Sequence, residues 1–318
     1  MMEKDQLREL LGVTLQRSEL PGLGPPSRGK VRDVYDLGER LLIVTTDRIS
    51  AFDVVLGTVP LKGQVLNTIA SHWFEQTRDI VANHVLAVPD PAAMLVRKLQ
   101  PLPVEVVVRR YITGSLWRAY QQGERDIYGL DLPAGLRADQ RLAEPIVTPT
   151  TKAEEGEHDA PLSPAEVISR GLVPDSLWRQ VVKTALELFA RGEELAARQG
   201  LILVDTKYEF GLDGDRLLVM DEIHTPDSSR YWEADSYQEL FAGGRPQRML
   251  DKENIRQWLI ERGFSGAGTP PALSDEVRVD LALTYARLQQ RLTGSEPVID
   301  PRPAAERLQA NLKQHGLL

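Results

Sequence analysis

The 318-residue sequence predicts an α+β fold in two parts. Strand-like runs dominate the first hundred residues, and mixed strands and long helices follow them, an order typical of α+β proteins. A proline-rich segment, Gln100-Pro101-Leu102-Pro103, separates the two parts. We therefore expect a domain of antiparallel β-structure at residues 1–102 and an α+β domain at residues 103–318, with a helical C-terminal extension at about 251–318.

Composition excludes several classes of protein. With 42% hydrophobic residues, the chain can bury a large core, and its net charge of −8 disfavours nucleic acid or anionic membranes as partners. The absence of cysteine excludes disulfides and thiolate metal sites. The polar start, Met1 to Gln6, is no signal peptide, and no apolar run approaches the roughly 18 residues of a membrane span. We expect a cytoplasmic protein.

The first part of the chain contains a predicted hairpin and a predicted helix. Leucines at helical spacing precede a proline-rich stop at Pro21 to Pro26. Two β-rich runs at 31–35 and 41–45 flank a turn-forming segment and predict a hairpin. Further elements are an amphipathic helix at 64–77 and strands at 93–99 and 104–109.

The second part begins with a short helix at 116–122 and an irregular stretch at 123–144. The polar segment 147–163 is too long for a simple connector, and we expect a functional loop there. A capping box at Ser163 and Glu166 precedes a helix at 177–199. Two strands follow at 201–223, and the tail from Asp251 is helical with a Gly/Pro break at 266–271.

The strands at 201–223 carry an unusual set of charges. Residues alternate faces along a strand, so Asp205, Lys207 and Glu209 share one face at about 7 Å spacing. An Asp-Gly turn then returns the chain toward Asp221. Carboxylates on neighbouring strands can hold magnesium together with phosphates and water. The alternative is a hairpin whose charged face is simply solvated, and the register is not defined by the sequence.

Two basic segments are candidate phosphate sites. Lys30 and Arg32 lie on one face of a predicted strand beside Gly29, without a P-loop pattern, and the alternative is a solvated edge strand. Arg109 ends an apolar strand shortly before Ser115, and a guanidinium with a hydroxyl can bind a phosphomonoester. The alternative there is a helix cap at Ser115. We interpret His224 as structural, and His158-Asp159 more readily as a turn than as a catalytic pair.

Six motifs taken together resemble the SAICAR synthetase (phosphoribosylaminoimidazole-succinocarboxamide synthase) family over roughly residues 25–260. They are Gly29 to Tyr35, Ser50 to Asp53, Val104 to Ser115, Thr151 to Glu154 with Gly156 to Asp159, Leu203 to Gly211, and Asp221 to Arg230. Each motif is weak alone, but six in this order are specific. The resemblance implies an N-terminal sheet like a kinase small lobe and an ATP-grasp-like second domain, with the tail from Asp251 to Gly294 packing rather than taking part in chemistry.

The resemblance also implies a reaction. ATP and L-aspartate convert carboxyaminoimidazole ribonucleotide (CAIR) to the succinocarboxamide SAICAR, ADP and phosphate through an acyl phosphate, with Mg²⁺. It assigns ATP phosphates to Gly29, Lys30 and Arg32, magnesium to Glu209 and Asp221, and the ribonucleotide phosphate to Arg109, Ser115 and Arg230. Asp205 and Lys207 become the catalytic pair near the imidazole amine and carboxylate.

The remaining implied contacts are less direct. Adenine is expected near Leu99 to Pro103, where Leu102 alone among residues 101–103 offers a backbone N–H. Ser50 and Asp53 are expected to bind substrate. The segment 150–160 is a candidate lid, with Lys152 and Asp159 as contacts for aspartate or nucleotide. The oligomeric state and the residues that hold free aspartate stay open.

Two other functions compete with the ligase. A small-molecule phosphotransferase would share the basic hairpin and the acidic site, although the chain has no H-R-D or D-F-G motif of protein kinases. A non-catalytic nucleotide-binding module would tolerate the loss of Asp205, Lys207 or Glu209. Dependence of ADP release on L-aspartate and CAIR separates the three hypotheses.

Overall fold

Two antiparallel sheets form the framework of the protein. The computed structural model describes residues 2–152 and 160–318. The first sheet has five strands in the order β1-β2-β3-β7-β6, and the second has six, in the order β10-β9-β11-β12 with β8 and β13 also paired to β11. The mixed α+β class is therefore confirmed.

The five-stranded sheet contains the predicted N-terminal hairpin. Its strands are β1 (Ser27–Arg28), β2 (Arg32–Asp36), β3 (Arg40–Thr45), β6 (Val85–Asp90) and β7 (Ala93–Arg97). Antiparallel pairing of β2 with β3 joins Arg32 to Thr45 and Asp36 to Leu41, so the turn lies where the sequence predicts it. A separate two-stranded hairpin, β4 (Arg48–Ala51) and β5 (Val54–Thr58), follows the sheet's first strands.

The six-stranded sheet is built around β11, its longest strand. Its members are β8 (Gln100–Pro101), β9 (Val104–Ile112), β10 (Gln140–Thr151), β11 (Leu201–Asp213), β12 (Arg216–Met220) and β13 (Ser229–Glu233). The pairing places Asp205 opposite Arg109 of β9 on one side and opposite Arg230 of β13 on the other. The turn between β11 and β12 pairs Glu209 with Met220, which supplies the register that the sequence leaves open.

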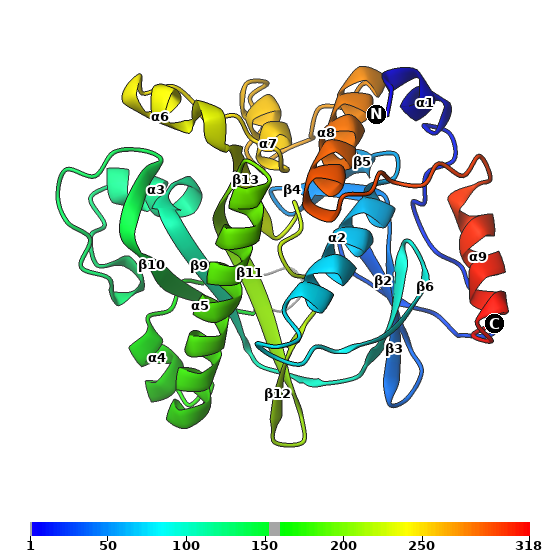
Figure 1. Cartoon of the computed structure of the whole chain (residues 1–318), viewed down its shortest axis with the longest axis horizontal. Helices are drawn as coiled ribbons and strands as arrows, with labels where there is room; N and C mark the ends of the chain where they lie inside the picture. Colours follow the sequence, from blue (N-terminus) through cyan, green and yellow to red (C-terminus); the bar gives the residue numbers. More distant parts are fainter. Residues whose placement is uncertain (1, 153–159) are drawn as a thin grey trace.

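Helices pack against both sheets. They are α1 (Lys4–Glu9), α2 (Lys62–Gln76), α3 (Gly114–Gln121), the short 3₁₀ helix η1 (Ile127–Gly129), α4 (Pro164–Ser169), α5 (Asp175–Arg198), α6 (Ala234–Ala242), α7 (Glu253–Ile260), α8 (Asp275–Thr293) and α9 (Ala304–Gln314). The capping box predicted at Ser163 and Glu166 begins α4. α5 packs against β11, and α2 lies between α5 and the five-stranded sheet (Figure 1).

One core joins the two sheets. It includes Val65 and Trp73 of α2, Met94 of β7, Val106 of β9 and Tyr208 of β11, all at most 3% exposed. The chain passes from the first sheet to the second at residues 98–103, where β8 pairs with β11. The division into domains at residues 102 and 103 stays a prediction.

The prediction of irregular structure around residues 123–163 is wrong in part. Residues 140–151 form β10, which pairs with β9 along its length apart from a register shift between Arg141 and Ile146. Pro145 and Pro149 obscure this strand in the sequence, and β10 tolerates them because it lies at the edge of the sheet. The lid predicted at 150–160 begins inside this strand, and its residues 153–159 lie outside the described part of the chain.

The helical tail with a break near 266–271 is confirmed by α7, α8 and α9. α8 packs against α1 and α2, while α9 packs against β6, so both helices pack on elements from the N-terminal part of the chain (Figure 1). Of the helices in the described residues, none has the length and apolar character needed to cross a membrane.

Candidate active site

A cavity of about 560 Å³ lies over the β9–β11 pair of the second sheet. Its floor comes from β9 and β11, and its walls come from β4, α3, β13 and the start of α7. Eight of the predicted site residues line this cavity: Lys30, Ser50, Asp53, Arg109, Ser115, Asp205, Lys207 and Arg230. Segments distant in the sequence therefore meet at one polar cavity.

Asp205 stands between two arginines on the cavity floor. One oxygen of its carboxylate accepts hydrogen bonds from Arg109 at 3.2 Å and from Arg230 at 2.5 Å. Arg109 also donates to the Thr148 hydroxyl at 2.9 Å and lies 3.5 Å from the Ser115 hydroxyl. Asp205 is 3% exposed and Arg109 is 5% exposed, so these bonds fix both groups.

Lys207 and Glu209 continue the same face of β11. Lys207 donates to Glu105 of β9 and to Glu209, both at 2.6 Å, and the second oxygen of Glu209 accepts from Lys152 at 2.6 Å. Burial alone would raise the pKa of Glu209, but the ammonium groups of Lys207 and Lys152 hold it well below its usual range. Lys152, predicted as a substrate contact, thus reaches this face of β11 from the end of β10.

Asp221 and Glu222 place further negative charge beside this face. Arg32 lies 3.2 Å from Asp221 and 2.9 Å from Glu222, so the predicted phosphate hairpin and the predicted metal site meet. Burial raises the pKa of Asp221 to about 6, with Glu209 and Glu222 adding to the shift while Arg32 and Lys207 oppose it. A carboxylate in this environment is stabilised by an additional cation.

The donor set fits a cation held partly by other ligands. Glu209 and Asp221 are two carboxylates, and in the described residues no group of three His, Cys, Asp or Glu side chains forms a complete metal site. Magnesium usually takes one or two protein carboxylates and completes its shell with phosphates and water. The acidic pair therefore suits magnesium bound together with a polyphosphate.

A buried arginine that the sequence did not mark as functional holds the β1–β2 hairpin, which carries the predicted phosphate contacts Lys30 and Arg32. Arg48 is 7% exposed and donates to the backbone carbonyls of Gly29 at 3.0 Å, Lys30 at 3.0 Å and Arg32 at 3.2 Å. It also donates to the Asp33 carboxylate at 2.9 Å. The Lys30 side chain pairs with Asp53, which brings the hairpin to the cavity wall. Arg48 therefore positions the backbone of residues 29–32.

The residues predicted to contact adenine are buried. Leu99 is 9% exposed and Leu102 is 7% exposed. The backbone N–H of Leu102 donates to the carbonyl of Phe210 at 2.9 Å. The idea that this N–H serves adenine is therefore wrong, because pairing between the segment after β8 and β11 already uses the donor. Leu99 and Leu102 are both apolar, and Leu99 lies so close to Gly211 that a Cβ atom on the glycine would be 2.9 Å from the Cβ atom of Leu99.

The predicted phosphate contact at Ser115 lies in the first turn of α3. Thr113, rather than Ser115, occupies the N-cap position, so the alternative of a cap at Ser115 is not what the structure shows. Gly114 has φ = +58°, and a Cβ atom on it would lie 2.4 Å from a guanidinium nitrogen of Arg230. This glycine lets Arg230 approach the start of the helix.

The prediction that the tail only packs is too narrow. Asp251, Lys252, Arg256 and Ile260 line the cavity from α7 and the two residues before it. Burial lowers the pKa of Lys252, with Arg256 and Lys62 adding to the shift while Asp227 and Glu222 oppose it. No local motif marks these residues, because they reach the cavity only through the tertiary fold.

A buried ion pair supports the far wall of the cavity. Lys62 is fully buried and donates to Asp227 at 2.7 Å, and the hydroxyl of Tyr285 donates to the same carboxylate at 3.1 Å. His224 is also fully buried, with its ring against Trp73 and its Nε2 bonded to Tyr208, in agreement with a structural role. Asp159 and His158 lie outside the described residues.

Comparison with known proteins places this geometry in one family. The family model described as SAICAR synthetase matches residues 26–270. A relative from Cytophaga hutchinsonii, phosphoribosylaminoimidazole-succinocarboxamide synthase, is 48% identical over 87% of this chain and 90% of its own. A relative of the same name from Legionella pneumophila (strain Lens) is 46% identical over 95% of this chain and 98% of its own.

Solved structures agree with the sequence relatives. SAICAR synthase from Saccharomyces cerevisiae, complexed with SAICAR, superposes with a TM-score of 0.78 at 33% identity, covering 89% of this chain and 99% of that chain. A SAICAR synthetase in complex with ADP has a TM-score of 0.66 at 25% identity, covering 86% and 100% of the two chains. The sequence match, the fold and the arrangement of the cavity lead to one conclusion: the chain belongs to the SAICAR synthetase family.

Proposed function

We propose that the 560 Å³ cavity is the active site of an ATP-dependent ligase that joins L-aspartate to CAIR. As a member of its family, the chain is a carbon-nitrogen ligase of purine biosynthesis that forms SAICAR, ADP and phosphate. The observation that carries the assignment of the site is the meeting of Arg109, Asp205 and Arg230 on the cavity floor, beside Lys207. This arrangement supports an anion-binding end of the cavity beside the network of Lys207 and its carboxylate partners.

ATP would lie against the hairpin of β1 and β2. Lys30 and Arg32 would contact its phosphates, and the backbone at Gly29, fixed by Arg48, would allow close approach. The base would lie in the apolar environment of Leu99 and Leu102. A relative in complex with ADP supports a nucleotide at this fold. The likeness of the first sheet to a kinase small lobe, and of the second part to ATP-grasp domains, belongs to this proposal.

Glu209 and Asp221 would hold Mg²⁺ together with the ATP phosphates. When bound, the ion would offset the negative charge that accumulates as one anion attacks another. The side chains of the protein supply the rest of the neutralisation. Lys207 and Lys152 contact Glu209, and Arg32 contacts Asp221, so cationic groups surround the proposed position of the γ-phosphate.

CAIR would bind with its phosphate at the end of the cavity formed by β9, α3 and β13. Arg109, Ser115 and Arg230 supply two guanidinium groups and a hydroxyl there. Asp205 would accept a hydrogen bond from the imidazole amine. Its two arginine partners keep it oriented for that role.

Lys207 would orient the CAIR carboxylate for reaction. One oxygen of that carboxylate attacks the γ-phosphorus of ATP, the bond to ADP breaks, and an acyl phosphate forms. The aspartate amine then attacks the acyl carbon and loses a proton, and phosphate departs with the attacking oxygen of the first step. Because an acyl phosphate hydrolyses in water, the buried floor of the cavity protects it.

Free L-aspartate would lie at the α7 end of the cavity. Lys252 and Arg256 project into the cavity from the start of α7, and the phosphate contacts Ser115 and Arg109 come from α3 and β9. The lowered pKa of Lys252 indicates that nearby carboxylates do not fully compensate its burial. An aspartate carboxylate would supply the missing negative charge. Ser50 and Asp53 of the β4–β5 hairpin line the same cavity and complete the proposed substrate contacts.

ADP release from the purified full-length chain tests the proposal. We expect release with MgATP only when both CAIR and L-aspartate are present, and SAICAR formed in equal amount. Release with CAIR alone and a stable phosphorylated product would instead identify a phosphotransferase. No release under any condition would leave only a nucleotide-binding module, and either result would reject the ligase.

A further inference from the structure

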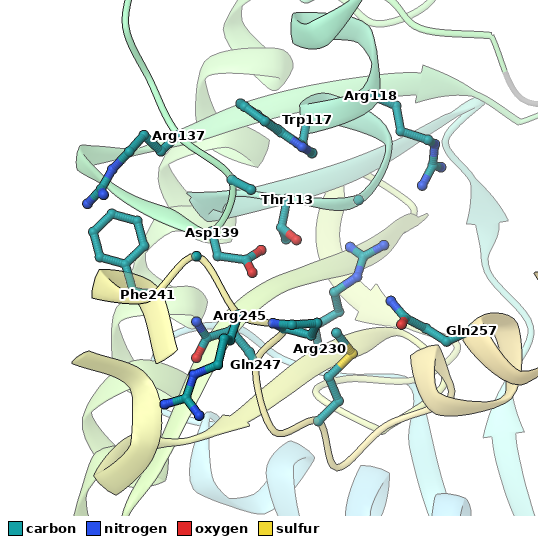
Figure 2. Close-up of a pocket in the computed structure, with 15 residues that line it drawn as sticks. Thr113, Trp117, Arg118, Arg137, Asp139, Arg230, Phe241, Arg245, Gln247 and Gln257 are labelled. Carbon is teal, nitrogen blue, oxygen red and sulfur yellow. The ribbon is translucent and has the colours of Figure 1, made fainter. Parts of the chain in front are cut away.

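The segment that leads into α7 lies against the loop before β13. Lys252, just before α7, lines the proposed active site, while Gln257 of α7 lines a second cavity, and Arg230 lines both (Figure 2). The backbone N–H of Lys252 donates to the carbonyl of Pro226 at 3.5 Å. Lys252 therefore lies next to the loop that carries Asp227.

The carboxylate of Asp227 uses each of its two oxygens for a different buried donor. The ammonium of Lys62, at the start of α2, donates to Oδ2 at 2.7 Å, and the hydroxyl of Tyr285, in α8, donates to Oδ1 at 3.1 Å. Lys62 and Tyr285 are fully buried, and the side chain of Asp227 is only 6% exposed. Two helices from distant parts of the sequence thus fix one carboxylate at the cavity wall.

Lys252 and Asp227 influence each other without forming a pair. Both line the proposed active site, and in the described part of the chain no ion pair joins them. Burial lowers the pKa of Lys252, and the charge of Asp227 is the largest influence against that shift. Because Lys62 and Tyr285 already use both oxygens of Asp227, the ammonium of Lys252 stays available to a ligand carboxylate.

We propose that Tyr285 is a positioning residue for the use of L-aspartate. Its hydroxyl holds the Asp227 carboxylate, so that the ammonium of Lys252 stays available to the substrate. This inference rests on the proposed function, in which Lys252 contacts aspartate. It gives α8, in the C-terminal tail, a part in substrate binding although α8 does not line the cavity.

The physical reason is the cost of an unpaired carboxylate oxygen inside the protein. Without the hydroxyl of Tyr285, Oδ1 of Asp227 loses a buried donor, which is unfavourable. A direct pair between Asp227 and Lys252 would relieve this cost. That pair would compete with the carboxylate of L-aspartate for the same ammonium.

Steady-state kinetics of Tyr285→Phe in the full-length chain tests this role. The substitution removes the hydroxyl and keeps the buried ring, and a circular dichroism melt checks folding. Because the new pair competes with aspartate, the KM for L-aspartate should rise about fivefold or more, whereas kcat at saturating aspartate and the KM values for ATP and CAIR should change less than about twofold.

Tyr237→Phe is the matched control. Tyr237 is 5% exposed, and its hydroxyl donates to the backbone carbonyl of Asp139 at 3.0 Å. It lines neither cavity, so loss of this hydroxyl should leave kcat and all three KM values as in the parent.

A second change shows whether Tyr285 acts through Lys252. In the Lys252→Met background Asp227 has no ammonium to capture, so adding Tyr285→Phe should alter the KM for L-aspartate less than about twofold. Succinate, which lacks the amine and cannot be ligated, gives a measure without turnover. Its Kd, measured by calorimetry with ADP and CAIR present, should rise about fivefold in Tyr285→Phe.

Three results would overturn the inference: an unchanged KM for L-aspartate in Tyr285→Phe, an equal increase in the KM values for all three substrates, or the same increase for L-aspartate in the Lys252→Met background. Each would leave the proposed function intact. ADP release by the parent that does not depend on L-aspartate would instead reject the proposed function and this inference together.

Discussion

The ammonium of Lys207 lies 2.6 Å from one carboxylate oxygen of Glu209, two residues further along β11. The other oxygen of Glu209 accepts from Lys152 of the segment after β10, also at 2.6 Å. The proposed metal ligand and the proposed substrate lysine therefore belong to one charge network. Any change in the charge of Glu209 affects both the cation site and the orientation of Lys207.

Glu209→Gln should abolish turnover and preserve the fold. Glutamine keeps the size and one acceptor but removes the charge that would hold the cation, so we expect kcat to fall by about 100-fold or more. Coupled assay of ADP release measures the rate, and a circular dichroism melt checks folding. Glu187→Gln, on the surface of α5, is the matched control. Full activity of Glu209→Gln would remove this residue from the metal site.

Lys252→Met should impair the use of aspartate selectively. The substitution keeps the apolar stem and removes the ammonium that faces the cavity, so the KM for L-aspartate should rise about tenfold or more, equivalent to about 1.4 kcal/mol. The KM values for ATP and CAIR should change less than twofold. Steady-state kinetics with each substrate varied in turn measures the three constants, and Lys183→Met on α5 is the control. Equal increases in all three would mean that Lys252 acts on the fold and not on aspartate.

Arg48→Lys should weaken ATP binding through the position of the β1–β2 hairpin. A lysine ammonium has three donors in place of five and cannot reach the carbonyls of Gly29, Lys30 and Arg32 together. We expect the KM for ATP to rise about tenfold, with the KM for CAIR nearly unchanged. Nucleotide titration by calorimetry gives an independent measure. An ATP affinity equal to that of the parent, in a folded variant, would exclude this positioning role.

His84 should make the protein less stable as the pH falls. Burial lowers the pKa of this imidazole to about 3, with Arg32 adding to the shift, whereas the unfolded chain has its ordinary value near 6.5. Between these values the unfolded state binds a proton that the folded state does not. The free energy of unfolding should therefore decrease by about 1.4 kcal/mol per pH unit below pH 6.5 from this group.

His84→Phe removes this titration and keeps a ring against Phe74. Urea unfolding at pH 7, 6 and 5 should show a shallower pH dependence in the variant than in the parent. Parallel curves would mean that His84 is not buried in its neutral form.

Local pattern predicts much of the fold. Apolar periodicity locates α2 and α5, the Ser163–Glu166 pair defines the start of α4, and turn residues identify the β2–β3 and β11–β12 hairpins. β10 escapes prediction because its two prolines are tolerated only at the edge of a sheet, and the sequence does not show which strand is at the edge. Edge position is a property of the assembled sheet.

The residues of the candidate site also divide into those that local sequence pattern predicts and those that it does not. Asp205, Lys207 and Glu209 are predictable because alternation on one strand places them on one face. Arg48 and Lys252 are not, because their contacts with the phosphate hairpin and the cavity depend on packing between distant segments. The sequence suggests the N–H of Leu102 as a donor to adenine because Pro101 and Pro103 have none, whereas the structure pairs this N–H with the carbonyl of Phe210.

Transfer of oxygen from CAIR to phosphate is the most direct test of the proposed chemistry. CAIR labelled with ¹⁸O in both carboxylate oxygens is incubated with the full-length chain, MgATP and L-aspartate, and the released phosphate is analysed by mass spectrometry. The acyl phosphate route predicts one ¹⁸O atom in each phosphate and one in the amide of SAICAR. Phosphate without label, formed together with SAICAR, would contradict it.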